Sequence, residues 1–250
     1  MSLRDLLLLA PVVLSLNSAG SEFDRPWANE STALVIDPYE GNSIEWDKVA
    51  TDSRVVAIIH RATFGKGADS SYFIRKKQAK MRGYAWGSYH IGRAGDPITQ
   101  ANFYLETAQP ESDEVMALDI EDLDPASSMT LDDARRFLLR IKEQTGRYPM
   151  LYANQAVAAE ISRRYKKDDV FSQAPLWYAR FRTHVSDFPV GTWNSYTLWQ
   201  FKSELNCKQS DPSGCPYWVP GTKSDMDVDV YNGSIAELKN RWPFRSGEQH

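Results

Sequence analysis

Eight short apolar stretches recur along the chain, and their spacing constrains the fold more than any other feature of the sequence. Each stretch is rich in β-branched or aromatic residues and is bounded by polar or turn-forming residues, which is typical of buried strands. The stretches cover residues 33–37, 55–61, 84–91, 114–121, 148–153, 174–179, 195–201 and 226–232. Their starts lie roughly 20 to 35 residues apart, so the longer intervals leave room for a crossover helix between parallel strands.

Helical patterns fill several of these intervals, mainly in the first two thirds of the chain. The sequence predicts helices at residues 70–82, 98–109, 131–145, 156–165 and 235–241. The clearest of them follows Thr130, which forms a capping-box pattern with Asp133, and ends before Gly146. A chain of 250 residues with eight strands and few helices in its last third is typical of a single α/β barrel with an irregular second half.

Two carboxylates interrupt the fourth apolar stretch. Asp119 and Glu121 are two residues apart, so on a strand their side chains share one face while Leu118 and Ile120 share the other. Repulsion between neighbouring carboxylates and loss of hydration raise the pKa of one of them, which a general acid at neutral pH requires. Such a pair also occurs in salt bridges to arginine or at strand ends in solvent, so the pair alone leaves both interpretations open.

Further acids lie in the first and last stretches. Asp37 ends the first one, and Asp225, Asp227 and Asp229 alternate with apolar residues in the last. A calcium loop of the EF-hand type starting at Asp225 would need glycine and glutamate at its sixth and twelfth positions, which hold valine and alanine instead. The alternation favours a strand with one acidic face, and we predict neither a metal ion nor a cofactor.

The net charge argues against nucleic acid as a binding partner, and the aromatic content is consistent with a sugar. The net charge of −4 gives no basic field for nucleic acid, and motifs of serine hydrolases, zinc proteases and phosphate-binding loops are absent from the sequence. The 8 Trp, 12 Tyr and 10 Phe supply many aromatic faces of the kind that pack against sugar rings. His90 ends a predicted strand beside Tyr89, which suits either a core histidine or a substrate contact.

The chain has two cysteines, Cys207 and Cys215, separated by a segment that contains Pro212 and Gly214. Their spacing is unlike that of zinc ligands. We predict a disulfide that closes this loop, with two free thiols as the alternative. A structural disulfide requires an oxidising compartment.

The N-terminus is consistent with export. Arg4 precedes an eleven-residue apolar run, Leu6 to Leu16, which is shorter than the ~20 residues of a membrane span and resembles a secretory signal. Cleavage near Ala19 or Gly20 would release the protein to the periplasm or outside the cell; a short apolar helix docked on the body is the alternative. The predicted organisation is a signal peptide at 1–19, a linker at 20–31, a barrel at 32–242 and a tail at 243–250.

The segments that carry these residues form an ordered series. They include VIDPYEGNSIEW at 35–46, IIHRATFG at 58–65, GSYHIGRAGDPITQANFYL at 87–105, MALDIE at 116–121 and DMDVDVYNG at 225–233. Together with YPMLYAN, LWYA and LWQF between them, this series resembles the glycoside hydrolases of family 25, lysozymes of the Chalaropsis type, over about residues 33–233.

The resemblance implies a fold, an activity and a site. The fold would be a modified (β/α)5(β)3 barrel in one domain, and the activity hydrolysis of the β-1,4 bond between N-acetylmuramic acid and N-acetylglucosamine in peptidoglycan. Glu121 would be the general acid, surrounded by Asp119, Asp37 and Asp227. The implied substrate-binding residues are Arg61, Tyr89, His90, Tyr152, Tyr178, Trp199 and Gln200. The expected partner of this monomer is a glycan strand, with neither nucleic acid nor a membrane span.

Two departures from the family pattern affect the rim of the expected cleft. The segment from Asp37 to Gly41 is two residues shorter than in the family and has Glu in place of Gln, and Phe64 stands where the family often has Glu. The alternative function is therefore a catalytically weak protein that binds or hydrolyses a cell-wall or chitin-type polysaccharide with the same barrel. We favour retention of anomeric configuration with help from the substrate's acetamido group, although carboxylates on one strand face suit either outcome.

Overall fold

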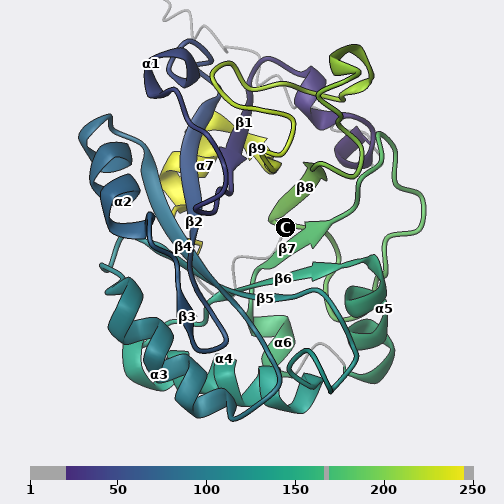
Figure 1. Ribbon diagram of the computed structural model, residues 1–250. Helices are drawn as coiled ribbons and strands as arrows, with labels where there is room; N and C mark the ends of the chain where they lie inside the picture. Colours follow the sequence, from purple (N-terminus) through teal and green to yellow (C-terminus); the bar gives the residue numbers. More distant parts are fainter. Residues whose placement is uncertain (1–20, 166–168, 245–250) are drawn as a thin grey trace, which may run out of the picture.

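The computed structural model describes residues 21–165 and 169–244, and its strands form a closed ring with helices outside it (Figure 1). The ring contains β1 (Thr32–Ile36), β2 (Val55–Phe64), β4 (Ala85–Ile91), β5 (Val115–Ile120), β6 (Met150–Asn154), β7 (Leu176–Ala179), β8 (Leu198–Lys202) and β9 (Val228–Ser234). Each of these strands coincides with one of the eight predicted stretches, so the predicted α/β barrel is confirmed.

One strand of the ring, β9 (Val228–Ser234), runs opposite to the other seven. From β1 through β2, β4, β5, β6 and β7 to β8, neighbouring strands are parallel. β9 lies between β8 and β1 and is antiparallel to both. A two-residue strand that the sequence did not predict, β3 (Gly67–Ala68), pairs with the end of β2. As a result, the carboxyl ends of seven ring strands and the beginning of β9 meet at one end of the barrel.

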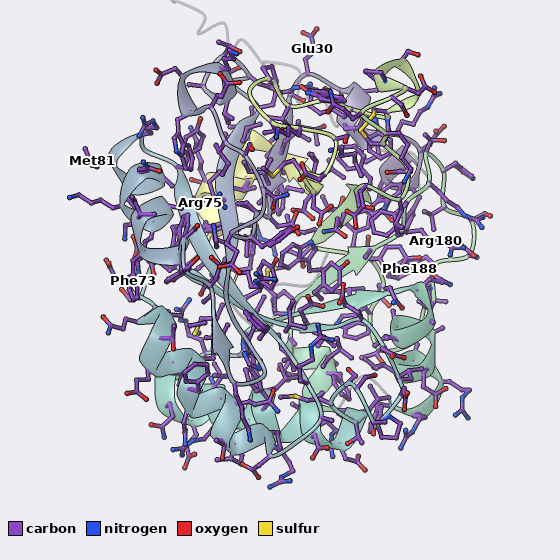
Figure 2. All side chains as sticks on the ribbon, viewed as in Figure 1. Glu30, Phe73, Arg75, Met81, Arg180 and Phe188 are labelled. Carbon is purple, nitrogen blue, oxygen red and sulfur yellow. A yellow bond between two sulfur atoms is a disulfide. The ribbon has the colours of Figure 1, made fainter. Side chains whose placement is uncertain are left out.

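The five predicted helices form within two residues of their expected bounds. They are α2 (Tyr72–Met81), α3 (Pro97–Ala108), α4 (Leu131–Thr145), α5 (Gln155–Arg164) and α7 (Ile235–Arg241). Two four-residue helices, α1 (Trp46–Val49) and α6 (Val170–Gln173), were not predicted, because one turn is too short to show a helical period. Phe73 and Met81 of α2 point away from the barrel (Figure 2). The five leading strands of the ring are each followed by a helix, as the (β/α)5(β)3 pattern requires.

Strand alternation divides the core into two parts. On β5, Leu118 and Ile120 face outward and pack with residues of the surrounding helices, whereas Ala117 belongs to the cluster inside the ring. The helix ends are fixed by predicted caps: the Thr130 hydroxyl accepts from the Asp133 N–H at 3.1 Å. Because both faces of every ring strand are covered, the polar side chains inside the ring are held in defined positions.

The described residues of the predicted linker and tail pack on the barrel, and the domain boundaries stay a prediction. Trp27, in the short helix η2 (Pro26–Ala28), is buried and stacks on Phe201 with ring centroids 3.9 Å apart. Phe244 is buried and stacks on Tyr231 at 5.5 Å. Aromatic side chains in both segments bury more apolar surface than a solvated linker would, which explains why they join the body. The predicted signal peptide at 1–19 lies outside the described residues.

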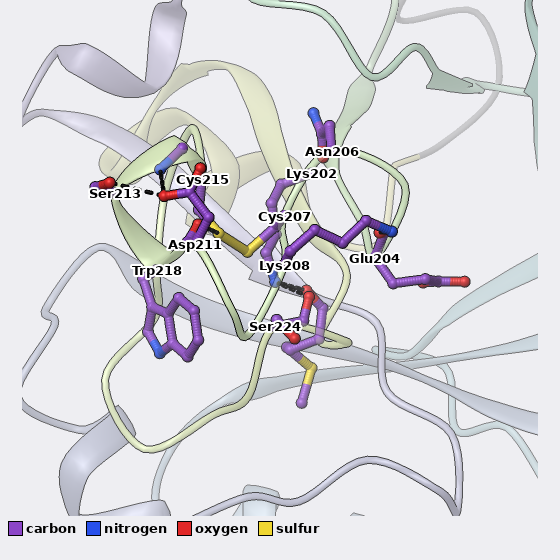
Figure 3. The surroundings of a disulfide bond; sticks show 12 residues. Lys202, Glu204, Asn206, Cys207, Lys208, Asp211, Ser213, Cys215, Trp218 and Ser224 are labelled. Carbon is purple, nitrogen blue, oxygen red and sulfur yellow. Dashed lines mark hydrogen bonds between the residues drawn. A yellow bond between two sulfur atoms is a disulfide. The ribbon is translucent and has the colours of Figure 1, made fainter.

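A disulfide joins Cys207 to Cys215, as predicted, in the long connection between β8 and β9. Figure 3 shows this bond beside Glu204 and Lys208, whose ammonium group donates to the Glu204 main-chain oxygen at 2.5 Å. The short helix η3 (Pro212–Gly214) lies inside the closed loop. Within the described residues, the longest apolar helices fall short of what a membrane crossing requires.

Candidate active site

Five carboxylates come together at the carboxyl end of the barrel. Asp37 follows β1, Asp119 lies in β5, and Glu121 comes directly after β5. Because β9 is antiparallel to its neighbours, its beginning reaches the same end and adds Asp227 and Asp229. The structure therefore brings together all four predicted catalytic residues, which come from three separate parts of the chain, and it adds Asp229.

A chain of hydrogen bonds orients Asp37. Tyr152 donates its hydroxyl to Gln200 Oε1 at 2.7 Å, and Gln200 Nε2 donates to Asp37 Oδ2 at 2.7 Å. On the other side, Trp177 Nε1 donates to Asp229 Oδ1 at 2.5 Å. Three strands thus fix two carboxyl groups through neutral hydrogen-bond donors.

Asp37 and Asp229 share an environment that favours protonation. Burial raises the pKa of Asp37 well above its ordinary value, and the charges of Asp229 and Asp227 raise it further. Burial also raises the pKa of Asp229. Asp37 Oδ1 and Asp229 Oδ2 are buried and have no partner while both groups are ionised. A proton on one carboxyl group lets it donate to the other, so we describe the two as a pair that holds a proton.

Asp119 and Glu121 differ in exposure although they lie on one face. Asp119 is buried, and its pKa is raised by burial and then by the charge of Glu121. Glu121 is exposed at the barrel end, and partial loss of hydration raises its pKa as well. The charge of Arg93 opposes both shifts. Glu121 therefore combines access to a ligand with a tendency to hold its proton, the combination that a general acid needs.

The charge of a buried lysine, Lys202, acts on Asp227. Burial raises the pKa of Asp227, and the charges of Glu204 and Asp229 add to this effect, whereas Lys202 opposes it. Lys202 is 1% exposed and its pKa is lowered to about 8, mainly by burial. Its ammonium group donates to the main-chain oxygens of Ser224, at 2.9 Å, and Met226. Lys202 thereby fixes the segment that delivers Asp227 to the cluster.

Three predicted substrate-binding residues lie inside the ring beside the carboxylates. Tyr89, Tyr152 and Gln200 are buried on the inner face. Trp177, which was not predicted, packs edge-on against the Tyr89 and Tyr152 rings, with centroids 6.0 and 5.1 Å apart. The aromatic floor of the site is therefore built by alternate residues of β4, β6 and β7.

Three others face outward, away from the inner face of the ring, and their contact with substrate stays a prediction. His90 stacks on Phe137 of α4 at 5.2 Å. Tyr178 donates its hydroxyl to Gln155 Oε1 on α5. Trp199 packs on Trp27 with centroids 5.3 Å apart. Each is the immediate neighbour of an inward residue, and successive side chains on a strand point to opposite faces.

Arg61 lies at the end of β2, between two carboxylates. Its guanidinium group is 3.4 Å from Glu40 and 3.2 Å from Asp69. It also lies over the rings of Tyr39 and Phe64, 4.7 and 4.8 Å from their centroids. These contacts hold Arg61 at the rim, and its contact with substrate stays a prediction.

The only trio of acids in the described residues with the spacing of metal ligands lies elsewhere. Glu111, Asp113 and Glu114 precede β5, at the opposite end of that strand from Asp119. Lys76 and Lys80 form ion pairs with Glu114 at 2.7 and 2.9 Å, so cations of the protein itself already compensate this trio.

Comparisons with known proteins show a family match and similar folds. The chain matches the model of glycosyl hydrolases family 25 over residues 36–210. It is similar in structure to a family GH25 lysozyme from Aspergillus fumigatus, with 21% identity, a TM-score of 0.66, and coverage of 84% of this chain and 98% of that one. A lysozyme from Streptomyces coelicolor is 22% identical with a TM-score of 0.63, and the match covers 84% of this chain and 96% of that one. A muramidase from Acremonium alcalophilum is 20% identical with a TM-score of 0.62, and the match covers 83% of this chain and 97% of that one. No curated protein sequence matches the chain.

Proposed function

The chain belongs to glycosyl hydrolases family 25, and from this premise we propose that it is a muramidase: it hydrolyses the β-1,4 bond between N-acetylmuramic acid and N-acetylglucosamine in peptidoglycan. The observation that carries the proposal is Glu121, an exposed acid with a raised pKa beside the buried carboxyl groups of Asp119 and Asp227. Structures similar to the chain are described as lysozymes and muramidases, which supports the same substrate.

In the proposed reaction, protonated Glu121 donates its proton to the glycosidic oxygen as the bond from that oxygen to the sugar carbon breaks. The buried acids stabilise the positive charge that develops on the sugar ring, because their low-dielectric surroundings strengthen the interaction. Asp119 also accepts from the N–H of the 2-acetamido group. This contact orients the acetamido oxygen to attack the anomeric carbon. Water then attacks the anomeric carbon and opens the ring that the acetamido oxygen has formed, and Glu121 takes a proton from that water.

This route predicts that the anomeric configuration is retained. Two successive displacements at the same carbon, first by the acetamido oxygen and then by water, return the original β configuration. Proton NMR of the first reducing ends released from peptidoglycan should show the β anomer before mutarotation. If the α anomer forms first, water attacks directly and the acetamido group plays no part in the displacement.

The role of Glu121 is tested by Glu121→Gln, which keeps the shape of the side chain but removes the transferable proton. We expect kcat on purified peptidoglycan to fall by about 10²- to 10⁴-fold. Circular dichroism should be unchanged, because the Glu121 side chain is exposed. Glu106→Gln on the exposed face of α3 is the matched control and should keep full activity.

Two outcomes would contradict the proposal. Normal turnover by Glu121→Gln would remove the residue from its role. Mass spectrometry of the new reducing ends identifies the bond that is cut, because muramic acid and glucosamine ends differ in mass. Glucosamine ends would favour a hydrolase for a chitin-type polysaccharide instead.

We also propose that the protein acts outside the cytoplasm, as a monomer on glycan strands. The Cys207–Cys215 disulfide supports an oxidising compartment, the periplasm or the exterior, because the cytoplasm keeps such thiols reduced. Detection of this protein in a culture supernatant or periplasmic extract, with the cysteines unreactive toward a thiol reagent, would support this location.

A further inference from the structure

A pocket of about 640 Å³ lies outside the ring, beside the loop that follows β4. One wall is the turn between β2 and β3, residues 64–67, and the other is the loop from β4 to α3, residues 93–96. Thr99, Gln100 and Phe103 of α3 close the pocket. This volume is within the range of pockets that bind small molecules.

The pocket adjoins the proposed reaction centre through Arg93. Gly92, the residue before it, donates its N–H to the Asp119 main-chain oxygen at 2.9 Å, so the loop follows the end of β5. The charge of Arg93 also acts on the carboxyl groups of Asp119 and Glu121. A group in this pocket would therefore lie beside a sugar bound at Glu121.

The main chain of Arg93 is fixed from two sides. Gln100 accepts from the Arg93 N–H at 3.1 Å and donates to the Arg93 oxygen at 2.8 Å. Because Gln100 Nε2 is used in this way, Gln100 Oε1 faces the ring of His90, 3.1 Å from Nε2. Gly65, with φ of +52°, lies so close that an added Cβ would be 3.1 Å from the Arg93 side chain. His90 thus supports this pocket from behind.

The pocket lining holds two cationic side chains, Arg93 and Lys66, and the charge of Arg93 also acts on Asp119 and Glu121. Within the part of the chain that the structure describes, neither the Arg93 guanidinium group nor the Lys66 ammonium group has an ion pair or side-chain hydrogen bond. The acid in the lining, Asp96, already accepts from the Thr99 N–H at 2.7 Å and lies 3.8 Å from Arg136. The rings of Phe64 and Phe103 add apolar surface. This combination suits an anion that also carries alkyl groups.

We propose that this pocket binds the acidic stem peptide attached to the muramic acid, with a peptide carboxylate at Arg93 and Lys66 and alkyl side chains against Phe64 and Phe103. The inference rests on the proposed function, since it assumes a muramic acid sugar at Glu121. It adds that the protein distinguishes peptide-bearing glycan from bare glycan. Lysine and arginine side chains are both suited to carboxylates, and the exposed Arg93 extends from a main chain that Gln100 holds in place.

The experiment compares two substrates: peptidoglycan with intact stem peptides, and the same glycan after an amidase has removed them. In the intact substrate the lactyl carboxyl group forms the amide bond to the peptide, and the amidase leaves it as a free carboxylate. The ratio of the two kcat/KM values therefore compares the peptide with a lactyl carboxylate at the same position on the sugar. We expect the wild type to prefer the peptide-bearing glycan, and Lys66→Glu to lower this ratio by about five-fold or more because it places a negative charge at the rim. Lys77→Glu, the same change on the exposed surface of α2, should leave the ratio as in the wild type.

A binding measurement covers the case in which turnover itself fails. Calorimetry with Glu121→Gln compares N-acetylmuramyl-L-alanyl-D-isoglutamine with N-acetylmuramic acid, and repeats both in the background of Lys66→Glu. Tighter binding of the peptide ligand that depends on Lys66 supports the inference, even if neither glycan is cleaved. Failure to cleave either glycan would overturn only the proposed function. Equal effects of Lys66→Glu on both glycans or on both ligands would show that the pocket binds the sugar or its lactyl group, and the inference would be wrong.

Discussion

Lys202 is a buried lysine, and lysine is rarely buried in folded proteins. It is almost fully buried, and the acids around it, Asp37, Asp225, Asp227 and Glu204, favour its charged form while burial opposes it. Two main-chain oxygens accept its protons, so a charged ammonium group is largely satisfied there. Its charge acts on Asp227, so Lys202 is a positive counterpart to the acidic cluster.

Replacement of Lys202 should change the pH dependence of activity. Because the charge of Lys202 lowers the pKa of Asp227, Lys202→Met should let Asp227 take up a proton at higher pH. The proposed stabilisation of a developing positive charge needs negative charge in the cluster, so the acidic limb of kcat/KM against pH should move upward. The measurement is a pH–rate profile on peptidoglycan.

Lys202→Arg serves as the control for that profile, since it keeps the charge and hydrogen-bond donors. It should restore the acidic limb at least in part. A purely structural role would lower kcat/KM equally at every pH in Lys202→Met, and such a uniform loss would show that the charge of Lys202 does not act on Asp227.

At the scale of the strand, the sequence predicts where strands lie better than which face each residue takes. All eight stretches become ring strands, because apolar β-branched runs of this length can bury themselves in few other ways. The facing of β5 was also predictable, since Asp119 and Glu121 mark the inner face against Leu118 and Ile120. In this strand the polar residues themselves show which side chains face into the ring.

Other strands lack a polar residue that distinguishes the inner face from the outer one. In β4, β7 and β8 the inward Tyr89, Trp177 and Gln200 each adjoin an aromatic or histidine residue that faces outward. Both faces of a ring strand are buried, so composition alone leaves two phases equally plausible. Had alternation been imposed, Tyr89 and His90 could not both have been placed in one cleft.

Long-range pairing decides the rest of the site. Asp229 reaches Asp37 because β9 pairs with β1 in one register, Val35 opposite Asp229, and a stretch of sequence does not encode that register. The pocket beside Arg93 likewise depends on the approach of the β2–β3 turn to the β4–α3 loop. The family resemblance implied that Asp37, Asp119 and Asp227 surround Glu121, whereas the contact with Asp229 and the pocket follow only from the closed ring.

For the whole molecule, buried His90 should make stability depend on pH. Burial lowers the pKa of His90 from 6.5 to about 4, and its ring nitrogens are engaged by Thr63 and Gln100. As the pH falls from 6.5 towards 4, the unfolded chain binds a proton at this histidine before the folded protein does. The folded state is therefore destabilised over this window by up to about 3 kcal/mol.

Urea unfolding at a series of pH values tests this effect. The raised pKa values of the buried acids act in the opposite direction over the same range, so the informative quantity is the difference between wild type and His90→Gln. This difference in free energy of unfolding should shrink as the pH falls from 7 to 4.5. His184→Gln, at an exposed position, should follow the wild type in parallel, and a constant difference for His90→Gln would refute the prediction.

The closed ring has a further consequence for a protein proposed to work in a crowded polymer. Every ring strand has a hydrogen-bonding neighbour on both sides, since β1 pairs with both β2 and β9. Among the described strands, only the two residues of β3 form a free edge. An edge this short offers few unpaired amide and carbonyl groups as a template, so the folded molecule resists self-association through strand addition.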